Sequence, residues 1–177
     1  MKSVLISIQP QWCELIASGK KTIEVRKTAP KSKTPFKVYI YCTNSKEKLW
    51  VLKETERAFT PEKIASICAA KDVGGTYKAN GKVIGEFVCD KIQEITYTQI
   101  YNFGRYKDVC EAETRLDFYA LDDYLKQKNG YGWHISDLVI YDKPRELSEF
   151  YDDDNILPTP LKRPPQSWCY VESEDEG

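Results

Sequence analysis

Apolar and polar residues alternate with a period of two in several short segments, which is the pattern of half-buried β-strands. The clearest case is residues 22–26, where the apolar residues Ile23 and Val25 alternate with polar neighbours. Successive side chains of a strand point to opposite faces, so Glu24 and Arg26 are expected to share a face, about 7 Å apart along the strand. Further strands are predicted at residues 4–8, 36–43, 82–90 with strand character to about 96, 138–141 and 167–172.

Helical spacing of apolar residues appears between these strands. The first helix is predicted to begin at Pro10, because proline is tolerated in the first turn, and to end at Gly19 in a left-handed conformation. The other segments are predicted as a partly helical stretch at 44–59, a helix from residue 60 to before Gly74, a tyrosine-rich loop at 97–106, a helix at 114–128, a glycine-rich turn at 130–134 and an irregular surface segment at 152–165.

The order of these elements predicts the fold class. Strands are interrupted irregularly by helices, without the regular strand–helix–strand alternation of a parallel sheet, which indicates an α+β domain around a mostly antiparallel sheet or small barrel. Residues 1–172 are long enough to bury one hydrophobic core and are taken as a single domain. Residues 173–177 form an acidic tail that is expected to be disordered.

Composition favours a water-soluble protein. The chain is 41% hydrophobic and 30% charged, and no apolar run approaches the roughly 18 residues that a membrane-spanning helix needs. The apolar run at residues 4–8 is too short for the core of a signal peptide and has no small-residue cleavage site after it. We therefore expect a cytoplasmic protein with no membrane partner.

Cysteine and histidine usage argues against metal chemistry. The six cysteines are scattered, without a C-x-x-C pair, which is typical of free thiols in a reducing compartment. A zinc site of cysteine and histidine ligands has no convincing ligand set, because His134 is the chain's single histidine. No metal and no cofactor are predicted, and a structural role is favoured for His134.

The net charge of −1 hides a basic N-terminal region. Residues 1–48 hold ten lysines and arginines against three glutamates, a net charge of +7, and the remainder of the chain carries −8. A locally basic surface on a nearly neutral protein can attract phosphates. A solvated lysine-rich loop at residues 27–37 explains part of the same charge.

Residues 19–26 concentrate the candidate chemistry. Lys20 and Lys21 precede a predicted strand that carries Glu24 and Arg26 on one face. An arginine can hold a phosphate or carboxylate through two parallel hydrogen bonds, and a buried glutamate can accept from a base amino group or act as a general base. The alternative is a surface salt bridge between Glu24 and Arg26, with both lysines in solvent; such pairs contribute about 0–1 kcal/mol.

The motif G-x-K-x-x-E-x-R at residues 19–26, placed after a strand and a short helix, resembles the signature of the ASCH domain family, a branch of the PUA-like superfamily. Segments 81–87, 130–135 and 164–168 resemble the pattern of its bacterial and phage members. The resemblance implies a PUA-like β-barrel with flanking helices and a cleft beside the signature strand. It also implies a ligand that is RNA or a modified nucleoside. The expected ligand-binding residues are Lys20, Lys21, Glu24, Arg26, Lys27, Trp133, Gln166, Ser167 and Trp168.

Enzymatic activity is a second hypothesis that the resemblance raises. One ASCH branch is similar to enzymes that hydrolyse the amide of acetylated cytidine with a lysine, a threonine nucleophile and a glutamate, and another member is described as a ribonuclease. Lys21 occupies the lysine position here, but Glu24 stands where the threonine would be. Lys21 and Glu24 are therefore the candidate catalytic residues of a hydrolase, and an adaptor that binds protein through the tyrosine-rich segment or the acidic tail is the third hypothesis.

Overall fold

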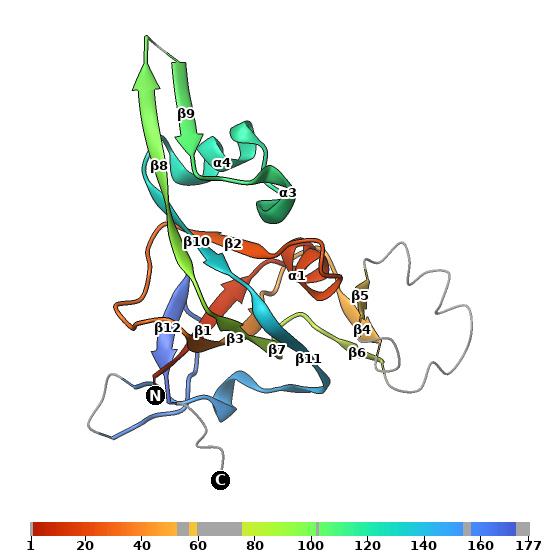
Figure 1. Cartoon of the computed structure of the whole chain (residues 1–177). Helices are drawn as coiled ribbons and strands as arrows, with labels where there is room; N and C mark the ends of the chain where they lie inside the picture. The colour runs from red at the N-terminus through yellow and green to blue at the C-terminus, as the bar shows by residue number, and fades with distance from the viewer. Residues whose placement is uncertain (1, 53–56, 60–75, 102, 154–156, 173–177) are drawn as a thin grey trace.

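The computed structural model describes residues 2–52, 57–59, 76–101, 103–153 and 157–172. A five-stranded sheet in the order β11-β7-β3-β1-β12 forms its centre (Figure 1). β1 and β3 are parallel and are connected through α1 and β2, whereas the other neighbours are antiparallel. The five strands are β1 (Ser3–Ile8), β3 (Phe36–Cys42), β7 (Lys82–Cys89), β11 (Ser136–Arg145) and β12 (Trp168–Val171).

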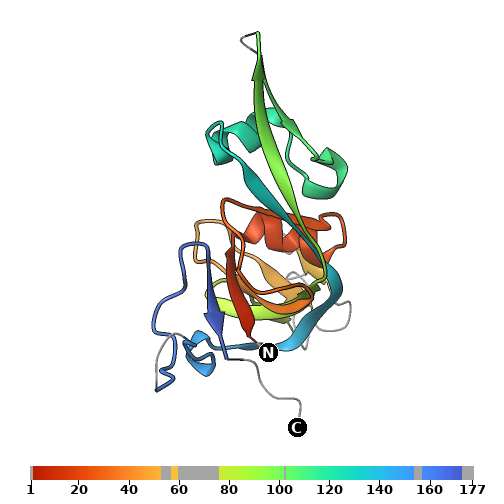
Figure 2. The same cartoon turned by 60° about the vertical axis from the view of Figure 1, so that its left-hand side comes forward.

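A second sheet carries the signature strand. Its order is β2-β10-β8-β9, all antiparallel, and the hairpin of β8 and β9 projects from the rest of the chain with α3 and α4 beside it (Figures 1 and 2). These elements are β2 (Ile23–Arg26), β8 (Ile92–Ile100), β9 (Phe103–Lys107), β10 (Gly130–His134), α3 (Glu111–Thr114) and α4 (Phe118–Leu125).

The remaining elements are short and lie around the two larger sheets. A small sheet in the order β5-β4-β6 lies to one side of the five-stranded sheet (Figure 1). The elements are α1 (Pro10–Ala17), β4 (Trp50–Leu52), β5 (Arg57–Phe59), β6 (Thr76–Lys78) and the 3₁₀ turn η1 (Leu147–Glu149). No helix in the described part of the chain has the length and apolar character that crossing a membrane requires.

The main hydrophobic core packs α1 and β10 against one face of the five-stranded sheet. Ile6, Val38, Ile84 and Trp133 are fully buried in it. Burying an aliphatic side chain of this size contributes about 1.5–3 kcal/mol, so alternate residues of the central strands hold the sheet to the helix. A separate cluster that includes Val25 and Leu121 joins β2 to α4 and brings that helix beside the signature strand.

Several predicted elements are confirmed. The chain is α+β with a mostly antiparallel sheet, and strands occur at each segment where the alternating pattern placed one. The first helix ends as expected: Gly19 has φ +71° and donates from N–H to the Ile16 carbonyl. Gly85 in β7 lies at a close approach of two strands, because a Cβ there would lie 2.3 Å from the Val139 carbonyl oxygen of β11.

Other element predictions are wrong. Part of the stretch 44–59 forms β4 and β5 instead of helix, residues 97–106 lie within the β8–β9 hairpin instead of a loop, and 130–134 is β10 instead of a turn. The helix predicted at 114–128 is interrupted, because Arg115 adopts φ +59° and Asp117 then caps α4 by accepting from the Ala120 N–H. The helix predicted from residue 60 and the tail at 173–177 lie outside the described residues, and the assignment of 1–172 to one domain stays a prediction.

Candidate functional site

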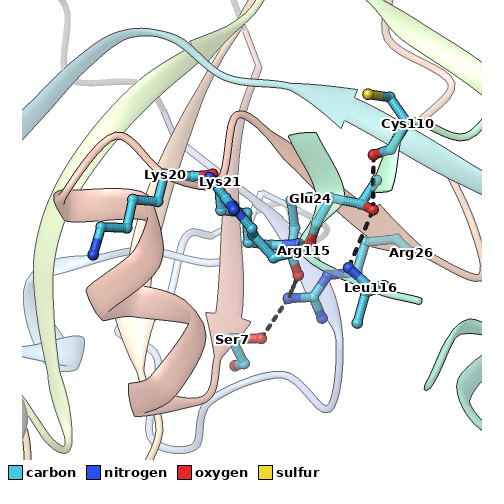
Figure 3. Close-up of polar contacts among 9 residues, drawn as sticks. Ser7, Lys20, Lys21, Glu24, Arg26, Cys110, Arg115 and Leu116 are labelled. Carbon is cyan, nitrogen blue, oxygen red and sulfur yellow. Dashed lines mark hydrogen bonds and ion pairs between the residues drawn. The ribbon is translucent and has the colours of Figure 1, made fainter. Parts of the chain in front are cut away.

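The end of α1 delivers Lys21 to the start of the signature strand. Gly19 and Lys20 close the helix by donating to the carbonyls of Ile16 and Leu15, which is the Schellman arrangement of a helix end. The Lys21 N–H also donates to the Leu15 carbonyl, so the chain turns tightly before β2 begins. The lysine side chain is thereby directed inward, while the Lys20 side chain points away from Glu24 and Arg26 (Figure 3).

Three charged side chains meet at β2, and we call them the Lys21–Glu24–Arg26 cluster (Figure 3). Glu24 Oε1 lies 2.9 Å from Arg26 Nη2, and Glu24 Oε2 lies 3.3 Å from Lys21 Nζ. One carboxylate is therefore shared by two cations, as the common face predicted for Glu24 and Arg26 allows. The cluster carries a net charge of +1 when all three groups are ionised.

Backbone carbonyls complete the environment of the two cations. Lys21 Nζ donates to the Thr114 carbonyl oxygen at 2.6 Å, which ties α3 to the signature strand. Arg26 Nη2 donates to the Ser7 carbonyl oxygen at 2.7 Å, and Nη1 makes only a long contact of 3.5 Å with Ser167 Oγ. Within the described residues, Arg26 Nε is buried and has no hydrogen-bond partner, so the guanidinium is not saturated.

The cluster is buried, which changes its electrostatics. The side chain of Lys21 is 2% exposed, and those of Glu24 and Arg26 are each 8% exposed. Burial lowers the pKa of Lys21 below its ordinary value; the nearby Glu24 carboxylate opposes this change in the pKa and Arg26 adds to it. Charges are rarely buried to this extent unless they are paired, and sites that perturb a pKa in this way are often functional.

A cleft of about 960 Å³ opens beside the cluster. Its volume lies at the upper end of the range typical of small-molecule sites. Its walls come from β1, α1, β2, α4 and the segment before β12, and its lining residues are Ser7, Gln9, Gln11, Trp12, Lys21, Glu24, Val25, Arg26, Lys27, Thr28, Thr43, Leu116, Ala120, Asp123, Tyr124, Pro164, Pro165, Gln166 and Ser167.

Six of the predicted ligand-binding residues line this cleft. The structure brings together Lys21, Glu24, Arg26, Lys27, Gln166 and Ser167. Lys27 is exposed at its edge, where its Nζ lies 5.1 Å from the centre of the Tyr124 ring. Ser167 accepts the Ser7 N–H through its carbonyl, so the last strand is held against the first beside the cleft.

Three predicted residues do not line the cleft. Lys20 is exposed; its N–H donates to the Leu15 carbonyl and its own carbonyl accepts from Arg115 Nε. Trp133 is 0% exposed and packs in the main core, with its ring 5.9 Å from that of Phe36. Trp168 is half-buried against the same core and donates from Nε1 to Thr28 Oγ1 at 3.0 Å, so it supports the loop after β2 and does not form a wall of the cleft.

His134 does not line the cleft, and its structural role stays a prediction. Its Nδ1 is 2.6 Å from Asp90 Oδ1, and both side chains are substantially exposed. The hydrogen bond to His134 lowers the pKa of Asp90. Among the described residues, no group of three or more histidine, cysteine, aspartate or glutamate side chains is placed to hold a metal ion.

Sequence reasoning missed the aromatic walls of the cleft. Trp12 is not among the predicted site residues, but it lines the cleft and Lys21 Nζ lies 5.3 Å from its ring centre. Tyr124 forms another wall from α4. The spacing within α4 places Ala120 and Tyr124 one turn apart, so a helical projection shows that they share a face, but not what that face covers.

The topology and the site together define a PUA-like α+β barrel with a charged cleft beside one strand. The family model of the ASCH domain matches residues 6–144, which is most of the chain, and the chain belongs to the ASCH domain family. The predicted resemblance and the predicted fold are both confirmed.

Solved structures from Zymomonas mobilis show the same fold. A tyrosine-to-phenylalanine variant of ZmASCH matches with a TM-score of 0.57 and 20% identity, covering 97% of this chain and 91% of that chain. A serine-to-alanine variant gives a TM-score of 0.56 and 19% identity, with 97% and 89% covered, and ASCH from the same organism gives 0.51 and 18%, with 97% and 88% covered. At these identities the likeness concerns the fold alone. No curated protein sequence matches the chain.

Proposed function

We propose that this ASCH protein binds RNA or a modified nucleoside in the cleft beside β2. The observation that carries the proposal is the buried Lys21–Glu24–Arg26 cluster, which has more positive than negative charge and faces a cavity. An ion pair that served stability alone would need neither the second cation nor the cavity. Membership of the ASCH family favours a nucleic-acid ligand for the same cleft.

Each part of the cleft suits a different part of such a ligand. Arg26 retains donor capacity at Nη1, which makes only a 3.5 Å contact with Ser167 Oγ, for phosphate or carbonyl oxygens, and the Lys27 ammonium lies at the rim. Trp12 and Tyr124 offer rings on which a base can stack, and stacking of this kind accepts any base. Gln166 is exposed and can reach a base edge through its amide.

Binding to short single-stranded RNA and to a panel of nucleosides tests the proposal. Arg26→Lys keeps the charge but removes the planar donor fork, so we expect affinity to fall at least tenfold. Lys27→Gln, at an exposed rim position that cannot unfold the core, is expected to weaken RNA binding by a few fold and to reduce its salt dependence. Lys37→Gln is a matched control on the outer face of β3 and should change neither quantity.

The proposal fails if both cleft variants retain wild-type affinity while their circular dichroism spectra show that they are folded. It also fails if no RNA or nucleoside binds the wild-type chain at any salt concentration. Because the rim variant leaves the buried cluster intact, a loss of folding in Arg26→Lys alone does not remove the test.

Hydrolysis of RNA or a modified base is the second candidate, favoured by one observation. The lowered pKa of Lys21 enlarges the fraction of neutral amine, which can accept a proton from an attacking hydroxyl or water. Glu24, 3.3 Å from that amine, can then receive or return the proton. Wild-type protein incubated with acetylcytidine and with short RNAs should give product, and turnover no greater than that of Glu24→Gln would rule out this mechanism.

The adaptor hypothesis stays a prediction. The tyrosine-rich segment is the β8–β9 hairpin, and Tyr101 and Phe103 near its end are 91% and 81% exposed. Large apolar side chains in such positions often contact another macromolecule. A pull-down that recovers protein without RNA, and that is lost in Tyr101→Ser or on deletion of residues 172–177, would favour this hypothesis over the first two.

A further inference from the structure

We infer that the free edge of β9 binds an extended acidic segment of a partner protein as an additional antiparallel strand. β9 is the outermost strand of the second sheet, and the hairpin that it forms with β8 extends past α3 and α4 (Figures 1 and 2). None of the β9 residues lines the cleft beside β2. The inference therefore goes beyond the proposed function and does not depend on it.

The register of the hairpin shows which backbone groups of β9 are directed to the free edge. Tyr97 of β8 lies opposite Tyr106, and its N–H donates at 3.0 Å to the side chain of Asn129, which directly precedes β10, the other neighbour of β8. Tyr97 and Tyr106 are therefore a non-hydrogen-bonded pair, so the N–H and C=O of Tyr106 are directed away from β8. Because this direction alternates along a strand, Gly104 also offers its N–H and C=O at the free edge.

This edge is open, unlike the other outer strands of the two larger sheets. Within the described residues β9 pairs with β8 alone, and no other hydrogen bond uses the N–H or C=O of Gly104 or Tyr106. β2 is buried along its whole length, β11 contains Pro144 and two shifts of register, and β12 is bridged on its outer side by Asp152. Burial, proline and irregular pairing all prevent the addition of a strand. β9 has none of these protections.

The open face of β9 is cationic. Phe103, Arg105 and Lys107 share it, about 7 Å apart from one to the next, and all three are exposed. The opposite face is covered, because the Tyr106 ring packs against Phe118 of α4, with 5.9 Å between the ring centres. A strand added at the edge is therefore selected by the side chains that it places on the open face.

The alternating cations favour an acidic strand over a second copy of this chain. Opposite charges directly across an antiparallel pair are stabilising, whereas like charges are destabilising. Acidic residues at positions i and i+2 of an incoming strand lie opposite Lys107 and Arg105, and an apolar residue at i+4 lies opposite Phe103. A second copy paired over the whole of β9 would instead place two arginines opposite each other at position 105. A nucleic acid neutralises the cations but has no alternating donors and acceptors to match the edge.

Binding of a designed peptide tests this inference. The probe is the fluorescent peptide Thr-Glu-Thr-Glu-Thr-Val-Thr, whose affinity for the full chain is measured by fluorescence anisotropy. One protein variant combines Arg105→Gln with Lys107→Gln, and its matched control removes two exposed charges elsewhere, with Lys91→Gln and Lys143→Gln. Two further peptides carry N-methyl groups, either on the two central threonines or on the two glutamates.

We expect the variant at positions 105 and 107 to bind the peptide about fivefold more weakly, and the control variant to bind it as wild type does. Methylation of the central threonines should weaken binding about tenfold, because their N–H groups face β9 in an antiparallel pairing. Methylation of the glutamates, whose N–H groups face away, should have little effect.

Hydrogen exchange measured by NMR locates the peptide. Its binding should protect the amides of Gly104 and Tyr106, which are directed to the free edge, and should leave Arg105 unchanged, because the Arg105 N–H is directed to β8. A contact made through charge alone would not protect alternate residues.

Several results would overturn the inference: no binding of the peptide, equal losses with the two methylated peptides, or equal losses in the cation and control variants. A single-stranded oligonucleotide that protects Gly104 and Tyr106 where the peptide does not would assign the hairpin to nucleic acid. Protection of these amides that rises with protein concentration alone would assign the edge to a second copy. Failure of the proposed function is a separate result, because Arg26→Lys should leave affinity for the peptide unchanged whatever it does to RNA.

Discussion

Two glutamates of this fold form similar ion pairs in different surroundings, and only one of them lies at the candidate site. Glu24 on β2 and Glu86 on β7 each bind one lysine, at 3.3 Å from Lys21 and 3.1 Å from Lys37. Each also accepts from a second donor: Glu24 from the Arg26 guanidinium at 2.9 Å, and Glu86 from a tyrosine hydroxyl on the neighbouring strand at 2.5 Å. By their contacts alone the two carboxylates are nearly equivalent.

Their surroundings are different. The Glu24 side chain is 8% exposed and faces the cleft, whereas the Glu86 side chain is 24% exposed, with the Lys37 side chain 30% exposed, and does not line the cleft. Glu24 has two cations, whereas the second partner of Glu86 is the neutral hydroxyl of Tyr141. An acid beside a lysine is therefore an ordinary feature of a sheet; burial, excess charge and an adjoining cavity distinguish the candidate site.

The largest expected difference is in stability. Glu24→Gln leaves two buried cations without their anion, which typically costs 3–5 kcal/mol, so we expect the free energy of unfolding to fall by about 3 kcal/mol. Glu86→Gln, at the partly solvated pair, should cost about 1 kcal/mol or less. Urea unfolding of both variants measures the contrast, and equal losses would show that the cluster is not electrostatically special.

Gly85→Ala is expected to cause the next largest loss in the free energy of unfolding. It should disturb the five-stranded sheet around Glu86 and leave the surroundings of Glu24 unchanged. A Cβ at this position would lie 2.3 Å from the Val139 carbonyl, and because that atom belongs to the backbone of β11 the two strands must separate. Overpacking of this kind costs about 1–3 kcal/mol. At temperatures where the variant is folded, its RNA affinity should equal that of wild type, and a weakened affinity would mean that the cleft depends on β11.

Lys21, the lysine partner of Glu24, is expected to make the stability of the protein depend on pH. Its folded-state pKa is lowered below 10.5, chiefly by burial, so the unfolded chain binds more protons than the folded chain in the pH window between the two values. The contribution of Lys21 to stability therefore rises with pH across that window. The difference in unfolding free energy between wild type and Lys21→Met should shift in favour of wild type as the pH approaches 10.5.

A direct measurement accompanies that prediction. NMR of the lysine ammonium groups should show Lys21 titrating below the ordinary lysine range, and in Glu24→Gln at still lower pH, because the carboxylate is the group that raises its pKa. A Lys21 signal that titrates in the ordinary range would contradict the burial argument.

Tyr141→Phe is expected to have the smallest effect. Burial, and after it the Glu86 carboxylate, raises the pKa of Tyr141, so its hydroxyl stays a donor at all accessible pH values. Removing one hydrogen bond at a half-buried position should cost about 1 kcal/mol in the free energy of unfolding, with no change in RNA affinity. A loss of RNA binding would indicate that RNA contacts the face of the five-stranded sheet that carries Tyr141, and not the cleft.

Part of this molecule could be predicted because the deciding physics is local. The contact between Glu24 and Arg26 follows from the period of a strand, and Gly19 at φ +71° follows from the chemistry of helix ends. The strands of the central sheet follow from their apolar alternation. Each of these features is set by residues within about one turn or one strand of one another.

The errors arose where packing overrides local composition. Gly130 and Gly132 suggested a turn, yet both lie in β10, where a Cβ would come within 2.7 Å of Leu125 and 3.0 Å of Ile23. The absence of a side chain at these two positions lets α4 and β2 pack closely against β10. The residues adjacent in sequence give no sign of that requirement. The same error explains the wrong prediction for Trp133. It was placed beside a turn, where it could reach a ligand, but it lies in a strand and is fully buried in the main core.

The pairing of the first and last described strands has a consequence for synthesis. β12 pairs with β1, so Ser3 lies opposite Val171, and Ser7 receives the Arg26 guanidinium while its hydroxyl donates to Pro165. During synthesis β1 leaves the ribosome first, and it cannot pair with β12 until residue 171 has emerged. One rim of the cleft is therefore absent from every nascent chain shorter than this, and the cleft is complete only once β12 has docked against β1.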